Sequence, residues 1–251
     1  MSPGTESDPL LDAPLLEVTV LHGRDAAAAT AGEADRLLLL SEPERGGLSP
    51  EPSTLSAVLR ETDLPVRVML RAGDSLSIDG GKFNRLLGTA RMCLELGATG
   101  VSFGFLDHDL EIDRASCAAV ANELVGIGWT FHRGFDQALD ARRAWRDVLD
   151  LPGLDAVASA GSTRGLASGG NELVERAAAN PRIAARLLVS GGLTGEQVPW
   201  LIRAGVRQFG LGEEVRPGGS WTKAYVDTAA VRAWRLLLDD AHQRALGVPV
   251  D

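Results

Sequence analysis

The feature that most constrains this chain is a regular alternation of short apolar runs with segments of helical periodicity. Eight apolar runs follow residue 14, at 15–21, 36–40, 66–70, 100–106, 129–132, 155–159, 186–190 and 207–212. Runs of this length, rich in branched residues and bordered by Gly or Asp, are typical of buried parallel strands. Eight strand–helix units in about 230 residues predict an α/β fold, a single (β/α)8 TIM barrel. An open, doubly wound sheet is the alternative, but units of such even size favour closure.

The segments between the runs carry apolar stripes at the spacing of one helix face. One stripe runs from Phe83 to Leu94 and is followed by Gly97, which predicts a helix with a glycine C-cap. Thr194 and Gln197 have the spacing of a capping box ahead of another apolar stripe. These patterns supply the helices that a barrel needs between its strands.

Composition excludes several classes of partner. The chain is 45% apolar and 24% charged, as in ordinary soluble globular proteins, and its net charge of −9 argues against nucleic acid or an anionic membrane as a partner. No apolar run reaches the ~18 residues that span a bilayer. The first residues lack the basic and apolar regions of a secretory signal. Two cysteines make no disulfide framework, so we expect a cytoplasmic location.

No internal shift in composition divides the chain, so we expect one barrel domain at residues 15–246. The first 14 residues are rich in Pro, Ser, Asp and Glu, a composition that predicts a disordered N-terminal tail. Residues 247–251 are expected to form a short C-terminal tail.

Polar residues gather at the predicted strand ends. In barrels of this kind the active site lies at the C-terminal ends of the strands. The candidates there, together with one acid inside the first run, are Glu17, Arg71, Asp107, Asp109, His132, Arg133, Ser159, Ser190, Gly191, Gly192 and Gly212. We expect them to surround the mouth of the barrel.

The segment TFHRGFD combines three polar side chains directly after an apolar run. Thr130 and His132 share a parity on the predicted strand, so both are expected to point into the barrel. A partly buried histidine can act as base, acid or ligand. Arg133 is a fixed cation suited to bidentate binding of an anion. Asp136 either orients one of these two or caps a helix that begins near Gln137.

Glu17 lies inside an apolar run, and a buried carboxylate needs a partner. Arg71 could supply that partner or could bind substrate. The glycine turns after the seventh and eighth runs, 190–192 and 210–212, offer unobstructed backbone N–H groups, which barrels often use to hold phosphate. They are also compatible with simple tight turns.

The acidic loop at residues 107–113 is either a solvated surface loop or part of the site. Asp113 precedes a predicted helix and is expected to cap it, and His108 is expected to be exposed. Cys93 and Cys117 fall inside predicted helices, away from the mouth. Thiolate and thioether are the ligands that Cu(I) prefers, so these positions argue against a copper centre at the mouth.

Several segments, spread over roughly residues 15 to 210 in a fixed order, resemble the copper homeostasis protein CutC family. They are LLEVTVL with Glu17, ADR at 34–36, PERGGLSP at 43–50, LDHDLEID at 106–113, TFHRGFD at 130–136 and AGV at 204–206. The resemblance implies a TIM barrel, a cytoplasmic and often oligomeric protein, and a role in binding or trafficking copper. It leaves His132 as the metal ligand at the mouth.

The chain departs from the family pattern at positions where metal ligands would be expected. Val18 to Val20 stand where the family carries a cysteine, and Leu38 and Leu40 stand where it carries an acid and a cysteine. Gly210 and Leu211 replace a histidine–serine pair, and the segment RAGDSL keeps one arginine where the family has two. The resemblance therefore implies copper while the residues lack its thiol ligands.

Three functions follow as alternatives. One is a copper homeostasis protein that binds copper through His132. Another is an enzyme, isomerase, lyase or hydrolase, in which Arg71 and Arg133 hold a small anionic metabolite and Glu17 or His132 moves a proton. The last is a non-catalytic homo-oligomeric scaffold. In each case we expect the segment GGSWTKAY, after the eighth run, to reach over the mouth or toward a neighbouring subunit.

Overall fold

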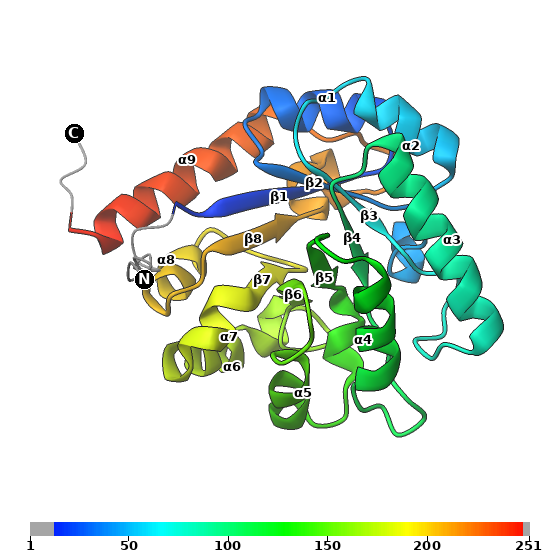
Figure 1. Ribbon diagram of the computed structural model, residues 1–251. Helices are drawn as coiled ribbons and strands as arrows, with labels where there is room; N and C mark the ends of the chain where they lie inside the picture. The colour runs from blue at the N-terminus through cyan, green and yellow to red at the C-terminus, as the bar shows by residue number, and fades with distance from the viewer. Residues whose placement is uncertain (1–12, 248–251) are drawn as a thin grey trace, which may run out of the picture.

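A computed structural model describes residues 13–247 and shows a closed barrel of eight parallel strands inside a ring of helices (Figure 1). The strands are β1 Leu15–Val20, β2 Arg36–Leu39, β3 Val66–Met69, β4 Gly100–Phe103, β5 Trp129–Phe131, β6 Leu154–Ser159, β7 Leu187–Ser190 and β8 Gln208–Leu211. Each strand pairs with the next one in the chain, and β8 pairs with β1. The predicted single (β/α)8 barrel is confirmed.

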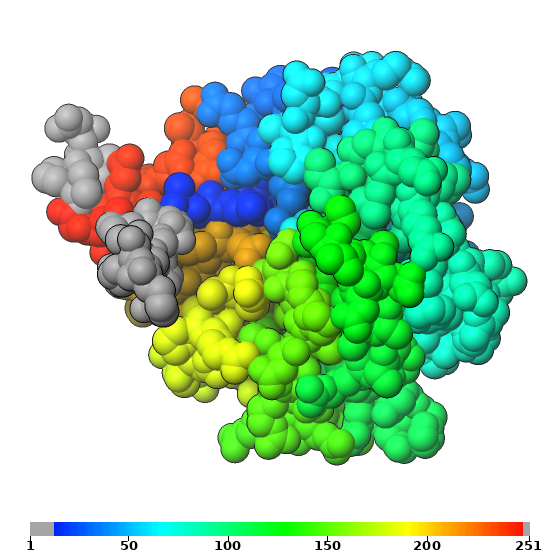
Figure 2. All heavy atoms as spheres, viewed as in Figure 1, coloured from blue at the N-terminus to red at the C-terminus, as the bar shows by residue number. Residues whose placement is uncertain are grey.

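Helices follow the strands around the barrel in chain order, so the blue beginning and the orange-red end of the chain meet (Figures 1 and 2). The α-helices are α1 Gly23–Ala31, α2 Pro52–Leu59, α3 Gly80–Leu96, α4 Arg114–Glu123, α5 Ala141–Val148, α6 Leu166–Ala179, α7 Pro181–Arg186, α8 Val198–Arg203 and α9 Thr228–Ala245. Short 3-10 helices are η1 Pro43–Arg45, η2 Arg133–Gln137, η3 Glu213–Val215 and η4 Pro217–Gly219. No helix within residues 13–247 is long and apolar enough to cross a membrane. The predicted tails lie outside the described residues, apart from 13, 14 and 247.

Side-chain caps fix where several helices begin and end. Asp79 caps α3 by accepting a hydrogen bond from the Lys82 N–H, and Gly97 ends that helix with a φ of +116°, as the sequence predicts. Asp113 caps α4, which is also as predicted.

Of the two roles considered for Asp136, capping a helix near Gln137 is excluded. A short 3-10 helix, η2, occupies that position instead, and α5 begins later, at Ala141. The cap of α5 is Asp140, which accepts hydrogen bonds from the N–H groups of Arg142 and Arg143. The carboxylate of Asp136 is therefore left for another contact.

The barrel interior is unusual in how it is filled. Most barrels of this fold fill it with layers of bulky aliphatic side chains. Here a buried polar network occupies the end where the strands begin: Arg36 pairs with Glu17, and Arg67 bonds both Thr130 and Asp155. Above this network, small inward residues take the place of large ones, namely Ser102, Ala158, Ser190 and Gly210. They leave space that opens at the other end of the barrel.

A buried ion pair ties the loop after β8 to the beginning of the chain. Arg216 and Asp25 both have fully buried side chains, and their closest approach is 2.7 Å, from Nη2 to Oδ2. Arg216 also donates to the backbone carbonyls of Thr19 and Ala224, while Asp25 accepts from the N–H of Val226. This cluster holds the β8 loop against α1, where the barrel closes.

Replacing Asp25 with alanine leaves the Arg216 guanidinium buried without its counter-charge. We expect Asp25→Ala to lower the free energy of unfolding by about 3–5 kcal/mol, measured by urea denaturation with circular dichroism. The matched control is Asp240→Ala, which breaks the surface pair with Arg244 on α9 and should cause no measurable change. A loss smaller than about 1 kcal/mol for Asp25→Ala would contradict this account.

Candidate functional site

A cavity of about 480 Å³ opens among the loops that follow the strands and extends down into the barrel. Every strand lines it, through Glu17, Thr19, Leu38, Met69, Ser102, Thr130, Ala158, Leu188, Ser190, Gly210 and Leu211. This volume lies within the range of small-molecule sites in proteins. A smaller hollow of about 280 Å³ lies outside the barrel, between α6 and α8, and takes no residue from the strands. The barrel cavity is therefore the candidate site.

Glu17 lies at the floor of the cavity and is almost fully buried. Its Oε2 accepts a hydrogen bond of 2.6 Å from the Nε of Arg36, which lies level with it on β2. Arg71, one of whose two considered roles was to supply this partner, does not do so, because it lies beyond β3 and donates to the carbonyls of Arg45 and Asp74. Glu17 Oε1 has no hydrogen-bond partner within residues 13–247. The floor thus presents one acceptor oxygen to the cavity.

His132 lies at the end of β5 with its imidazole buried and facing the cavity, as its parity with Thr130 predicts. Burial, together with the nearby charge of Arg71, lowers the pKa of His132 to about 4 from the ordinary 6.5. Its Nδ1 accepts a hydrogen bond of 3.0 Å from the Gly134 N–H. A neutral imidazole that accepts at Nδ1 carries its proton at Nε2. His132 is therefore a neutral hydrogen-bond donor at neutral pH.

Gly134 is required by this contact. A Cβ at position 134 would lie 2.6 Å from the Cε1 and 2.8 Å from the Nδ1 of His132, too close for any other residue unless the ring moved. A side chain at position 134 would therefore displace the ring that the Gly134 N–H orients.

Arg133 is held at the rim by Asp136. Its Nε and Nη2 donate to Asp136 Oδ2 at 3.2 and 3.1 Å, so Asp136 orients the arginine, one of the two roles considered for it. Burial raises the pKa of the Asp136 carboxyl, against the opposing hydrogen bonds from Ser159 Oγ and the Ala160 N–H. Ser159 is thus turned toward Asp136 and does not line the cavity. Arg133 Nη1 has no hydrogen-bond partner in the described part of the chain, and it lies against Gly191.

The glycine turns after β7 and β8 line the cavity, but their backbone N–H groups are already bonded. Glu214 accepts hydrogen bonds from Gly192 and Leu193 at Oε1, at 2.8 and 3.1 Å, and from Gly212 at Oε2, at 2.7 Å. The chain's own carboxylate therefore occupies the place where we considered a phosphate. The sequence analysis overlooked Glu214, for which the only signal is an acid two residues beyond Gly212.

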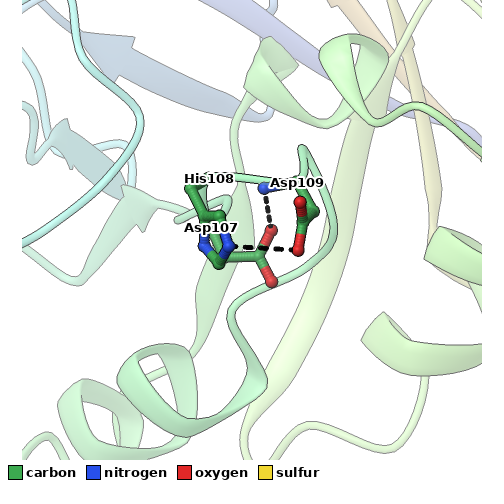
Figure 3. Close-up of side chains that lie close together, drawn as sticks. All are labelled: Asp107, His108 and Asp109. Atoms are coloured by element: carbon green, nitrogen blue, oxygen red, sulfur yellow. Dashed lines mark hydrogen bonds and ion pairs between the residues drawn. The ribbon is translucent and has the colours of Figure 1, made fainter.

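The acidic loop after β4 lies apart from the cavity. Asp107, His108 and Asp109 place one potential ligand atom each within 4.8 Å of one another (Figure 3). Asp107 Oδ1 accepts from the N–H groups of Asp109 and Glu111, which makes it a turn-forming residue. The side chains of His108 and Asp109 are 88% and 68% exposed, as expected for His108.

The predicted site residues thus separate into two groups. Those that line the cavity are Glu17, His132, Arg133, Ser190, Gly191, Gly192 and Gly212. Those that do not line it are Arg71, Asp107, Asp109 and Ser159. Arg71 nevertheless lies close by, because a Cβ at the lining residue Gly46 would be 2.8 Å from its Nη1.

The rim contains residues that the sequence analysis did not select. Trp221, from the segment expected to reach over the mouth, lines the cavity and packs so closely on Gly212 that a Cβ there would lie 2.5 Å from the ring. The guanidinium of Arg216 lies 5.0 Å from the centre of that ring. Arg164 is an exposed cation at the rim that forms no ion pair within residues 13–247.

Copper does not fit the donor atoms of the cavity. Cys117 is buried beside the Phe105 carbonyl, and burial raises the pKa of its thiol to about 12; burial also raises the pKa of Cys93. Neither cysteine lines the cavity, whose lining includes one thioether, that of Met69. Metal binding at Nε2 of His132 would require its proton to move to Nδ1, which faces the Gly134 N–H. A thioether and an engaged imidazole make a poor Cu(I) site.

Comparison with curated proteins finds relatives of similar length. A family protein CutC from Enterobacter sp. (strain 638) is 27% identical over 209 residues, which cover 83% of this chain and 81% of the relative. A family protein CutC from Klebsiella pneumoniae (strain 342) is 29% identical over 195 residues, covering 77% of this chain and 78% of the relative.

Solved structures share the fold. A CutC protein from Streptococcus agalactiae superposes with a TM-score of 0.69 at 20% identity, covering 79% of this chain and 98% of that one. Phosphoribosyl anthranilate isomerase from Thermococcus kodakaraensis gives a TM-score of 0.58 at 14% identity, covering 90% and 99%. The model of the CutC family matches residues 15–214, which is most of the chain and all eight strands. The chain therefore belongs to the CutC family.

Proposed function

We propose that the protein is an enzyme that binds a small organic anion in the barrel cavity. One observation carries this proposal: a cavity lined by all eight strands presents several polar atoms that no other group of the described chain engages, and three of them belong to side chains held in place by hydrogen bonds. These are Glu17 Oε1 at the floor, His132 Nε2 on the wall and Arg133 Nη1 at the rim. Free polar groups inside an enclosed site are what recognition of a ligand requires.

The three groups have complementary roles. The neutral His132 donates from Nε2 and can polarise a carbonyl oxygen, while Glu17, paired with Arg36, can accept a proton at Oε1. Glu17 on β1 and His132 at the end of β5 come from opposite sides of the eight-stranded ring. Arg133 supplies a cation for the carboxylate or phosphate of the substrate. This arrangement supports proton transfer next to a carbonyl, which is the chemistry of an isomerase or a lyase.

A role in copper homeostasis, which the resemblance implies, rests here on family membership. The donor atoms of the cavity do not fit Cu(I), so such a role would not depend on Cu(I) bound in the cavity. The cytoplasmic location and the homo-oligomeric state stay predictions.

Filling the cavity should abolish ligand binding without changing charge. We expect phosphoenolpyruvate, pyruvate or glycerol 3-phosphate to raise the melting temperature of the wild type. Ala158→Leu should weaken that binding by at least about tenfold, by calorimetric titration, because the added side chain enters the cavity. The control, Ala245→Leu, makes the same change on the exposed end of α9. Equal binding by Ala158→Leu, or no binding of any of these anions to the wild type, would contradict the proposal.

The titration of His132 can be measured directly. The unfolded chain takes up this proton near pH 6.5 and the folded protein near pH 4, so the free energy of unfolding should fall as the pH is lowered through that window. The variant His132→Asn keeps an acceptor for the Gly134 N–H but does not titrate, so its free energy of unfolding should depend less on pH. Urea denaturation at several pH values gives the pH dependence of the unfolding free energy for both proteins. NMR of the His132 ring reports its protonation directly. A ring that titrates near pH 6.5 would contradict the lowered pKa of His132.

Copper binding is tested by an anaerobic competition titration with Cu(I). We expect the wild type to take no Cu(I) from a chelator of moderate affinity, because the cavity lacks thiolate. His132→Ala should behave in the same way. Tight one-to-one binding that disappears in His132→Ala would show instead that the imidazole is a copper ligand.

A further inference from the structure

Two loops at the rim of the cavity are joined by one carboxylate. Glu214 bonds the N–H groups of Gly192 and Leu193, after β7, and that of Gly212, after β8. We call these three N–H groups the cradle. They converge on one point because Gly191 and Gly192 have φ values of +96° and +85°, a conformation that favours glycine. The cradle therefore depends on a backbone shape that side chains rarely allow.

The three donors of the cradle determine which chemical groups can bind there. Three N–H groups can only donate, so they are satisfied by an acceptor with at least two oxygens and a negative charge. A carboxylate meets that requirement, and so does a phosphoryl group. Glu214 therefore shows what the cradle binds.

The cradle also lies where a ligand would reach it. Gly192, Gly212 and Glu214 all line the barrel cavity. The guanidinium of Arg133 rests on Gly191, so closely that a Cβ there would lie 2.0 Å from Nη1. Glu214 is only half-buried, and its carboxylate can turn outward from the rim. A ligand's anionic group placed there would contact Arg133 as well as the three N–H groups.

We propose that the cradle binds the oxyanion group, phosphoryl or carboxylate, of the cavity's ligand, and that Glu214 is a displaceable stand-in that occupies the cradle in the free protein. This inference rests on the proposed function and specifies where the anionic end of the substrate lies. The displacement lowers the apparent affinity of the ligand, because the internal carboxylate competes for the same donors. When the ligand leaves, Glu214 reconnects the two loops.

Inorganic phosphate and acetate serve as the probes, titrated into 15N-labelled protein while the amide signals of Gly192, Leu193 and Gly212 are followed by NMR. Glu214→Ala frees the cradle, and we expect it to bind one of the two anions at least about tenfold more tightly than the wild type, with shifts at these three amides. Glu214→Gln keeps the shape of the side chain but removes its charge. Its affinity for the anion should therefore lie between that of the wild type and that of Glu214→Ala. The probe that binds Glu214→Ala more tightly identifies the phosphoryl or the carboxylate class.

The matched control is Glu213→Ala, which removes the same charge from the neighbouring residue of the rim but frees no N–H group. The inference is overturned if Glu214→Ala binds neither anion more tightly than Glu213→Ala does, or if the shifts occur elsewhere. That failure is distinct from failure of the proposed function, because binding of the organic anions and its loss in Ala158→Leu are measured on proteins that retain Glu214. Thermal melts of each variant confirm that it is folded.

Discussion

Charges buried inside a closed barrel need partners, and this requirement organises the structure. Arg36 and Arg67 enter the barrel near the beginnings of their strands, and each finds a carboxylate there, Glu17 and Asp155. A buried charge without a partner would destabilise the fold by roughly several kcal/mol. The paired residues of the network are therefore held in fixed positions. It fills one end of the interior, and the small residues above it leave the cavity. The floor of the site is therefore part of the barrel's own packing.

The walls of the site are held with similar precision. Asp136 receives four hydrogen bonds from three residues, Arg133, Ser159 and Ala160, and so connects the end of β5 to the end of β6. Gly134 fixes the ring of His132 in the same turn. The groups that face the cavity are thus supported by groups that do not, which is how a preorganised site keeps its geometry without a ligand. The segment TFHRGFD contains residues that line the cavity, His132 and Arg133, and residues that support them, Gly134 and Asp136.

The strands and the inward direction of His132 were predictable because apolar runs and parity are local properties. The partner of Glu17 was not, because Arg36 becomes its neighbour only through the register of β1 and β2. Ser159 follows Ala158 on a strand that is apolar on both faces, so the sequence does not say which of the two points inward. Asp107 lies on a loop and Glu214 in the short 3-10 helix η3, and the course of both segments depends on contacts far along the chain. The sequence therefore predicted where the mouth of the barrel lies, but not which residues line the cavity.

Arg216 pairs with Asp25 where the barrel closes and also lies over the ring of Trp221 at the mouth. One side chain therefore contacts both the place where the barrel closes and a residue that lines the cavity. A survey of variants that scores cellular abundance would therefore register Arg216 as a folding residue, although it also contacts a residue of the rim. Substitutions in the loop after β8 that preserve the fold must therefore keep the ion pair between Arg216 and Asp25, which joins this loop to α1 where the barrel closes.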